Sequence, residues 1–110
     1  MKKFSIYDLR RVKESSLLPS LSLEGYRIVR GGVHVYRPGE ISHKGEKHVH
    51  EQPEIFIGLD GEAIMMVNGK KYPFRGGEII LIEPGEEHHV IASKNNPITL
   101  AWLDVKRIEP

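Results

Sequence analysis

The sequence predicts an all-β fold, an antiparallel sandwich or barrel such as a jelly roll. Helical patterns are scarce, and short runs rich in Val, Ile and aromatic residues recur along most of the chain. Glycine-rich and proline-rich turn signals separate these runs at regular intervals. Because no helices stand between the expected strands to make parallel crossovers, an antiparallel jelly-roll β-barrel is the expected architecture.

Seven strands are expected in the second and larger part of the chain. They cover residues 26–37, 54–59, 62–67, 70–74, 78–82, 88–92 and 98–106. Gly31-Gly32 inside the first of them predicts a bulge or a tight bend. Asp60-Gly61 and Asn68-Gly69 each predict a two-residue hairpin turn.

The first 25 residues are expected to form an N-terminal arm or edge segment of a single domain that spans residues 1–110. Residues 26–106 would form the barrel core, since 110 residues suffice for one hydrophobic core only. A helix-like stretch covers residues 7–18, and Pro19 is expected to end it. The segment from Phe4 to Leu9 is suited to pair with the exposed sheet edge of a neighbour, which predicts a homodimer.

Composition and charge exclude several classes of function. Sixteen basic and fifteen acidic residues give a net charge of +1 and are scattered, so no nucleic-acid partner is expected. No apolar run reaches the length of a membrane span, and the opening MKKFSIYDLRRVKESS lacks the apolar stretch of a secretory signal. The sequence therefore predicts a cytoplasmic protein with no membrane partner.

Histidine and carboxylate side chains are the candidates for the chemistry, because the chain has no cysteine. In an extended chain, residues two apart point to the same face, so His48 and His50 share a face and Glu54 has the same parity. His88 follows the Pro84-Gly85 turn at the head of another strand and is the natural fourth member. Three imidazoles and a carboxylate suit a divalent transition metal, namely Fe, Mn, Zn, Ni, Co or Cu.

The spacing of these residues resembles the two sequence motifs of the cupin superfamily. The first, G-x5-H-x-H-x3,4-E-x6-G, is similar to the stretch that includes His48, His50 and Glu54 and ends at Gly61, although only two residues separate Gly45 from His48. The second, G-x5-P-x-G-x2-H-x3-N, is similar to the stretch GEIILIEPGEEH, residues 77–88. That stretch has Glu83 at the position of the first proline, and Ala92 stands at the position of the terminal asparagine.

The resemblance implies a small single-domain cupin with a metal at the wider mouth of its barrel and water in the open positions. His48, His50, Glu54 and His88 would be the ligands. Cupins of this kind include dioxygenases, isomerases and decarboxylases, and a small-molecule dioxygenase is the first hypothesis because it needs least from the protein beyond metal, open positions and an apolar cavity. The alternative is a non-catalytic module that binds or senses a sugar or another small molecule. No catalytic base stands out beyond the ligands.

Four further residues are candidates for a substrate pocket, each with a structural alternative. Phe56 has the parity of Glu54 and either shapes the cavity or packs in the core. His34 and Tyr36 share a face of the first strand and either line the pocket or pack in the sheet, and Trp102 is equally open. Arg75 and Tyr36 are the polar groups expected near the pocket mouth, and the alternative for each is a surface residue.

Three more positions have expectations of their own. His89 should face away from His88 and be exposed or contact a partner. Of the adjacent Met65 and Met66, one should face inward and one outward. Glu83 is either a solvated carboxylate or a group that handles protons near the metal.

Overall fold

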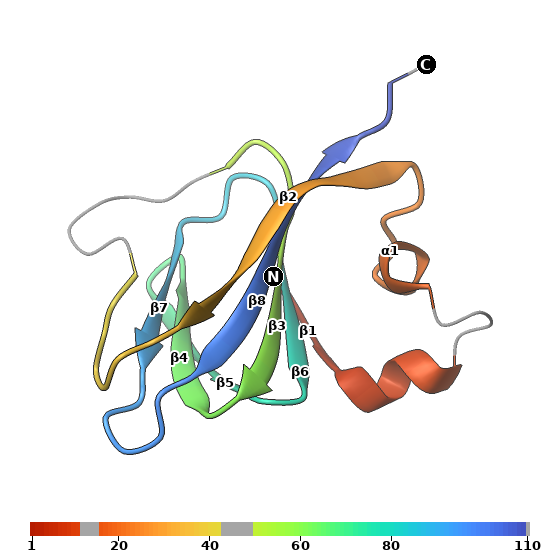
Figure 1. The fold of residues 1–110 in the computed structure, drawn as a ribbon. Helices are drawn as coiled ribbons and strands as arrows, with labels where there is room; N and C mark the ends of the chain where they lie inside the picture. Colours follow the sequence, from red (N-terminus) through yellow and green to blue (C-terminus); the bar gives the residue numbers. More distant parts are fainter. Residues whose placement is uncertain (12–15, 43–49, 110) are drawn as a thin grey trace.

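In the computed structural model, the chain is an antiparallel all-β jelly roll, as the sequence predicts (Figure 1). The structure describes residues 1–11, 16–42 and 50–109. Its elements, in chain order, are β1 (Lys2–Ser5), the 3-10 helix η1 (Ile6–Arg11), α1 (Leu17–Ser20), β2 (Tyr26–Val35), β3 (Glu54–Asp60), β4 (Glu62–Val67), β5 (Lys70–Arg75), β6 (Glu78–Ile82), β7 (His88–Ala92) and β8 (Thr99–Arg107).

The strands form two sheets that enclose the main core. The larger sheet has the order β1-β6-β3-β8-β2, and the smaller sheet has the order β5-β4-β7. Fully buried side chains of both sheets, including Met65 and Phe74 of the smaller sheet and Ile80 and Leu100 of the larger, pack together between them. The pocket described below opens into this inter-sheet space.

The N-terminal segment covers the outer face of the larger sheet. A second cluster of buried residues joins Leu21 and Leu23 to Ile55, Ile79 and other side chains of that face. Figure 1 shows η1 and α1 on this side of the molecule and β4, β5 and β7 on the opposite side. Strand β3 is therefore covered on both faces, which explains why its first residues are almost all buried and apolar.

The register of the larger sheet places side chains in rows that lead into the pocket. Glu54 of β3 is paired with Asp104 of β8, and Asp104 is paired in turn with Arg30 of β2. In the next inward-facing row, Phe56 is paired with Trp102. Neighbouring strands thus bring together residues that are far apart in the sequence.

The Asn68-Gly69 turn is the expected hairpin, but the Asp60-Gly61 turn is not. Asn68 and Gly69 both have positive φ and join the paired strands β4 and β5. Gly61 instead joins β3 of the larger sheet to β4 of the smaller sheet. A Cβ atom there would lie 2.3 Å from the carbonyl oxygen of Pro97, so the lack of a side chain at Gly61 allows this tight corner between the sheets.

The expectations for the N-terminal segment need correction. The helix-like stretch 7–18 is two short helices, η1 and α1, and residues 12–15 between them lie outside the described residues. Pro19 does not end a helix but stands within the single turn of α1, where a missing N–H removes no helical hydrogen bond. Strand β1 pairs with β6 of its own chain, where pairing with a neighbour was expected. The homodimer stays a prediction.

The expected irregularity in the first strand lies earlier than Gly31-Gly32. The pairing of β2 with β8 shifts between Ile28 and Arg30, and both glycines are regularly paired. Glycine is favoured there for a different reason, because a Cβ on Gly31 would lie 2.7 Å from the carbonyl oxygen of Trp102. None of the described helices is long and apolar enough to cross a membrane.

Candidate metal centre

Glu54, His50 and His88 meet at one end of the inter-sheet space. Nε2 of His88 lies 2.8 Å from Oε1 of Glu54, and Nε2 of His50 lies 3.6 Å from the same oxygen. One potential ligand atom from each residue lies within 4.8 Å of the other two. Glu54 and His88 are buried and His50 is partly exposed, so the group has one side towards the solvent. This geometry could hold a metal ion.

The orientation of His88 suits a metal ligand. Its Nδ1 lies 3.1 Å from the carbonyl oxygen of Glu86. A carbonyl oxygen only accepts hydrogen bonds, so Nδ1 carries the hydrogen and the lone pair of the neutral ring is on Nε2, which faces Glu54. Metal-binding histidines commonly donate their other ring N–H to a carbonyl oxygen in this way, because the bond fixes the tautomer. The donor set therefore fits a divalent metal.

The backbone turn before β7 fixes the relative positions of the two histidines. The N–H of Gly85 donates to the carbonyl oxygen of His50 over 2.9 Å. The same turn leads directly to His88, whose ring centroid lies 5.7 Å from that of His50. The Pro84-Gly85 turn thus positions His50 as well as the ligand that follows it.

Asp104 and Arg30 surround the carboxyl group of Glu54. Burial raises the pKa of Glu54, and its hydrogen bond with Asp104 raises it further, against the opposing effect of His88. Partial burial alone would raise the pKa of Asp104, but the hydrogen bonds with Glu54 and Arg30 outweigh it and lower that pKa. Nε of Arg30 donates to Oδ2 of Asp104 over 2.7 Å. A bound cation would favour the ionised form of Glu54.

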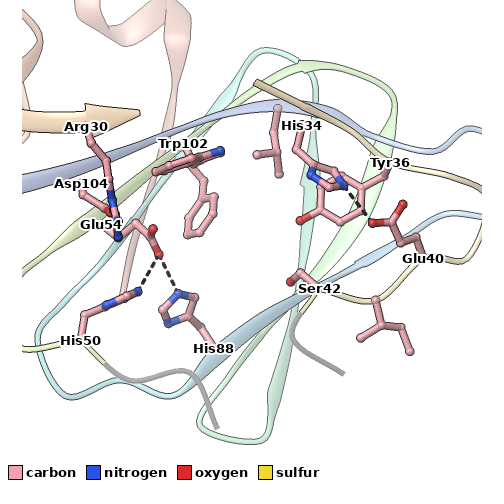
Figure 2. A pocket seen from close by; sticks show the side chains of 13 residues that line it. Arg30, His34, Tyr36, Glu40, Ser42, His50, Glu54, His88, Trp102 and Asp104 are labelled. Carbon is pink, nitrogen blue, oxygen red and sulfur yellow. Dashed lines mark hydrogen bonds and ion pairs between the residues drawn. The ribbon is translucent and has the colours of Figure 1, made fainter. Parts of the chain in front are cut away.

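A pocket of about 410 Å³ opens in front of this group. Its wall combines aromatic and apolar side chains with polar ones. The lining residues are Arg30, His34, Tyr36, Glu40, Ile41, Ser42, His50, Glu54, Phe56, His88, Leu100, Trp102 and Asp104. Figure 2 shows His50, Glu54 and His88 on one side of the pocket and His34, Tyr36, Glu40 and Ser42 on the other.

Most of the residues that the sequence singled out come together at this pocket. Three of the four expected ligands form the candidate metal centre, and His48 lies outside the described residues. The four residues expected at a substrate pocket, Phe56, His34, Tyr36 and Trp102, all line the cavity. Their contact with a substrate remains a proposal.

Arg75 is not near the pocket mouth; it is an exposed surface residue, which was the alternative. It ends β5 and lies beside Gly58 and Gly76, in a shallow depression away from the pocket. Glu83 is also absent from the pocket lining. Its Oε2 lies 3.1 Å from the amino nitrogen of Met1.

The alternation expected along two strands is confirmed. His88 is buried, whereas His89 is partly exposed and outside the pocket. Met65 is fully buried and Met66 is partly exposed.

Four polar pocket residues were missed from the sequence, Arg30, Glu40, Ser42 and Asp104, as were the apolar Ile41 and Leu100. For Asp104 and Arg30, the sequence held a usable indication that the side chain points into the pocket. Asp104 has the parity of Trp102 on the expected strand 98–106, and Arg30 has the parity of His34 on the strand 26–37. Glu40 and Ser42 follow a turn, where alternation no longer predicts direction.

A jelly roll with a His, Glu and His group at the mouth of its inter-sheet pocket defines a class of small barrel proteins. The family model described as "Cupin domain" matches residues 26–105, so the chain belongs to the cupin family. This confirms the resemblance that the two motifs indicated.

Solved structures show the same fold. A Cupin 2 conserved barrel domain protein from Salinispora arenicola is 22% identical, with a TM-score of 0.60 and coverage of 72% of each chain. The plu4264 protein from Photorhabdus luminescens is 30% identical, also with a TM-score of 0.60, and the match covers 67% of this chain and 59% of that one.

Among curated proteins, the chain is similar to dimethylsulfoniopropionate lyase DddW from Ruegeria pomeroyi. The two are 31% identical over 61 residues, which make up 56% of this chain and 38% of the lyase. The match thus spans well under half of the lyase.

Proposed function

We propose that the protein is a metalloenzyme that binds a small organic substrate at a divalent transition metal held by His50, Glu54 and His88. The observation that carries this proposal is the convergence of the three ligand atoms within 4.8 Å at the wall of a 410 Å³ pocket. Small-molecule sites are typically concave and mostly apolar, with a few polar groups that converge. This pocket has that character.

His48 is proposed as the fourth ligand. It shares the parity of His50 in the sequence, and three imidazoles with one carboxylate leave two positions of an octahedral ion open. A bound Fe, Mn, Zn, Ni, Co or Cu ion would polarise a substrate oxygen there or support redox chemistry. The protein's part is to fix the ligands and to shape the cavity around the open positions.

The pocket residues support a substrate with a negatively charged or polar end and a short carbon skeleton. Arg30, whose Nε is paired with Asp104, brings its guanidinium group to the pocket wall, and the guanidinium carbon lies 5.9 Å from the centre of the Trp102 ring. The buried residues Phe56 and Leu100 supply apolar surface to the pocket wall. A small organic acid matches this distribution of charge and apolar surface.

Oxygen-dependent cleavage by a dioxygenase is the first reaction to test, because it uses the open metal positions and an apolar cavity. Non-oxidative lyase chemistry is the second candidate, and the similarity to the DddW lyase supports it. Isomerase and decarboxylase reactions belong to the same non-oxidative class.

Reconstitution experiments distinguish these alternatives. Metal-free protein would be loaded with each of the six metals and incubated with a panel of small organic acids, with oxygen uptake and product formation followed in parallel. Turnover that consumes oxygen indicates a dioxygenase, and turnover that continues without oxygen indicates a lyase, isomerase or decarboxylase. Ligands that raise the melting temperature without any turnover would contradict the enzyme proposal and indicate a binding or sensor module.

A further inference from the structure

A second polar pair lies across the pocket from the candidate metal centre. Nε2 of His34 lies 2.9 Å from Oε2 of Glu40, and both side chains line the cavity. Figure 2 shows this pair on the wall opposite His50 and His88. Both groups therefore face the cavity in which a small molecule would bind.

We infer that His34 is a catalytic base, oriented by Glu40, that removes a proton from a substrate held between it and the metal. The inference rests on the proposed function, since the metal site would hold the substrate's other end. The substrate class is a small 2-oxo acid or a related carbonyl acid, which offers two oxygens to the open metal positions. Such a molecule also has acidic hydrogens on the carbon next to its carbonyl group.

Glu40 is well fixed for orienting a histidine. Its Oε1 accepts a hydrogen bond from the backbone N–H of Arg37 over 2.9 Å, and its own N–H donates to the Arg37 carbonyl over 3.0 Å. Its carbonyl oxygen accepts from the N–H of Ala92 over 2.8 Å, which ties this turn to β7. These hydrogen bonds hold the Glu40 carboxylate beside His34.

The same carboxylate sets the tautomer of His34. The Arg37 N–H lowers the pKa of Glu40, and the hydrogen bond with His34 lowers it further, so Glu40 is ionised near neutral pH. An ionised carboxylate only accepts hydrogen bonds, so Nε2 of His34 carries the hydrogen. In the neutral ring the lone pair is then on Nδ1, which is the atom that would accept the substrate proton. This is the arrangement of a base held by an orienting carboxylate.

Tyr36 is the other candidate base on this wall, and its environment argues against that role. Its ring centroid lies 4.1 Å from that of His34, and the residue is buried. Burial raises the pKa of Tyr36, which outweighs the opposing hydrogen bond with Ser42. Tyr36 therefore keeps its hydrogen at neutral pH and serves as a hydrogen-bond donor, which leaves His34 as the base.

The step balances within the pocket. The bond between carbon and the acidic hydrogen breaks, an N–H bond forms at Nδ1 of His34, and the electron pair moves to the carbonyl oxygen as an enolate. The new positive charge on the imidazolium lies beside the Glu40 carboxylate. Because the side chain of His34 is 46% exposed, its new proton exchanges with water.

Hydrogen exchange of pyruvate in D2O tests the inference, because pyruvate is a small 2-oxo acid with an exchangeable methyl group. NMR would follow deuterium incorporation with protein loaded with Zn²⁺, which is redox-inert. The wild type is expected to exceed Zn²⁺ alone, and His34→Gln to lose about 100-fold of the exchange rate. Glu40→Gln removes the charge that orients the base and faces its imidazolium but leaves the base in place, and is expected to lose about 10-fold. Pyruvate and Zn²⁺ should bind both variants as they bind the wild type.

The control variant is Val33→Gln, which introduces the same side chain at the neighbouring exposed position of β2. It should exchange pyruvate at the wild-type rate. Equal exchange in His34→Gln and the wild type would overturn the inference, as would absence of pyruvate binding, or binding without exchange above that of Zn²⁺ alone. Failure of the wild type to bind Zn²⁺ in the parallel titration would instead refute the proposed function.

Discussion

Nε2 of His88 lies 2.8 Å from Oε1 of Glu54, although the two residues are 34 positions apart and belong to different sheets. This contact joins the first residue of β7 to the first residue of β3 at one end of the inter-sheet space. Removing one partner of a buried polar pair leaves the other unsatisfied, so the contact is sensitive to substitution.

Replacement of Glu54 by Gln should weaken metal binding by about 100-fold or more, because a neutral amide is a much poorer ligand than a carboxylate. Calorimetric titration with Zn²⁺ would measure the difference. Glu62→Gln is the matched control, since that glutamate is exposed at the start of β4. Unchanged affinity in Glu54→Gln would exclude Glu54 as a ligand.

Trp102 should report metal binding by fluorescence. It is the single tryptophan of the sequence and lines the same pocket as the three ligands. A paramagnetic ion such as Ni²⁺ quenches an indole at short range, so titration of the metal-free wild type should lower the emission and saturate at one equivalent. In Glu54→Gln the quenching should need much more Ni²⁺. Quenching that is equal in both proteins would place the ion elsewhere.

The even-numbered residues of the strands show how far the sequence could predict the site. Alternation pointed Phe56 inward with Glu54 and put His34 on one face with Tyr36, while Trp102 was left open; the structure has all of them on the pocket wall. The same rule would have found Arg30 and Asp104. It could not find the bond from His34 to Glu40, because Glu40 returns to the sheet through a turn whose path depends on long-range contacts.

The fold was predictable where neighbouring residues determine the conformation of a strand or turn. It was less predictable where pairing with distant strands determines that conformation. The strands 62–67, 78–82 and 88–92 have the expected bounds, and Asn68-Gly69 forms its hairpin. The Asp60-Gly61 signal is as strong locally, yet its strands separate into two sheets because each finds other partners. Strand β1 was missed for the same reason, since it exists through its pairing with β6.

Gly58→Ala should destabilise the fold by about 1–3 kcal/mol. A Cβ atom at this position of β3 would lie 2.2 Å from the carbonyl oxygen of Arg75, and backbone cannot move aside as a side chain can. Urea unfolding would measure the change. Leu59→Ala, at the exposed neighbouring position, should cost about 0.5 kcal/mol or less. Equal stability of Gly58→Ala and the wild type would contradict the close approach.

Glu40 should contribute stability that disappears in acid. Its pKa is lowered from the ordinary value of 4.5 by the Arg37 N–H and by His34, so the folded state favours the ionised form. The contribution is therefore complete above pH 4.5 and is lost as the pH falls through the lowered value in the folded protein.

Unfolding free energies of the wild type and Glu40→Gln, measured from neutral pH to about pH 3, would test this. The wild type should be more stable at neutral pH, and the difference should shrink as the pH falls. A difference that stays constant over this range would contradict the role of the Glu40 charge.

The metal content of purified wild-type protein and of His50→Ala is the measurement on which the proposed metal centre depends. Both would be prepared without a chelator and without an affinity tag that removes metal, then measured by elemental analysis. The wild type should contain about one equivalent of a divalent transition metal, and His50→Ala should lose most of it, because that substitution removes a ligand. Wild-type protein that holds no metal, and takes up none when Fe, Mn, Zn, Ni, Co or Cu is added, would contradict the proposed metal centre.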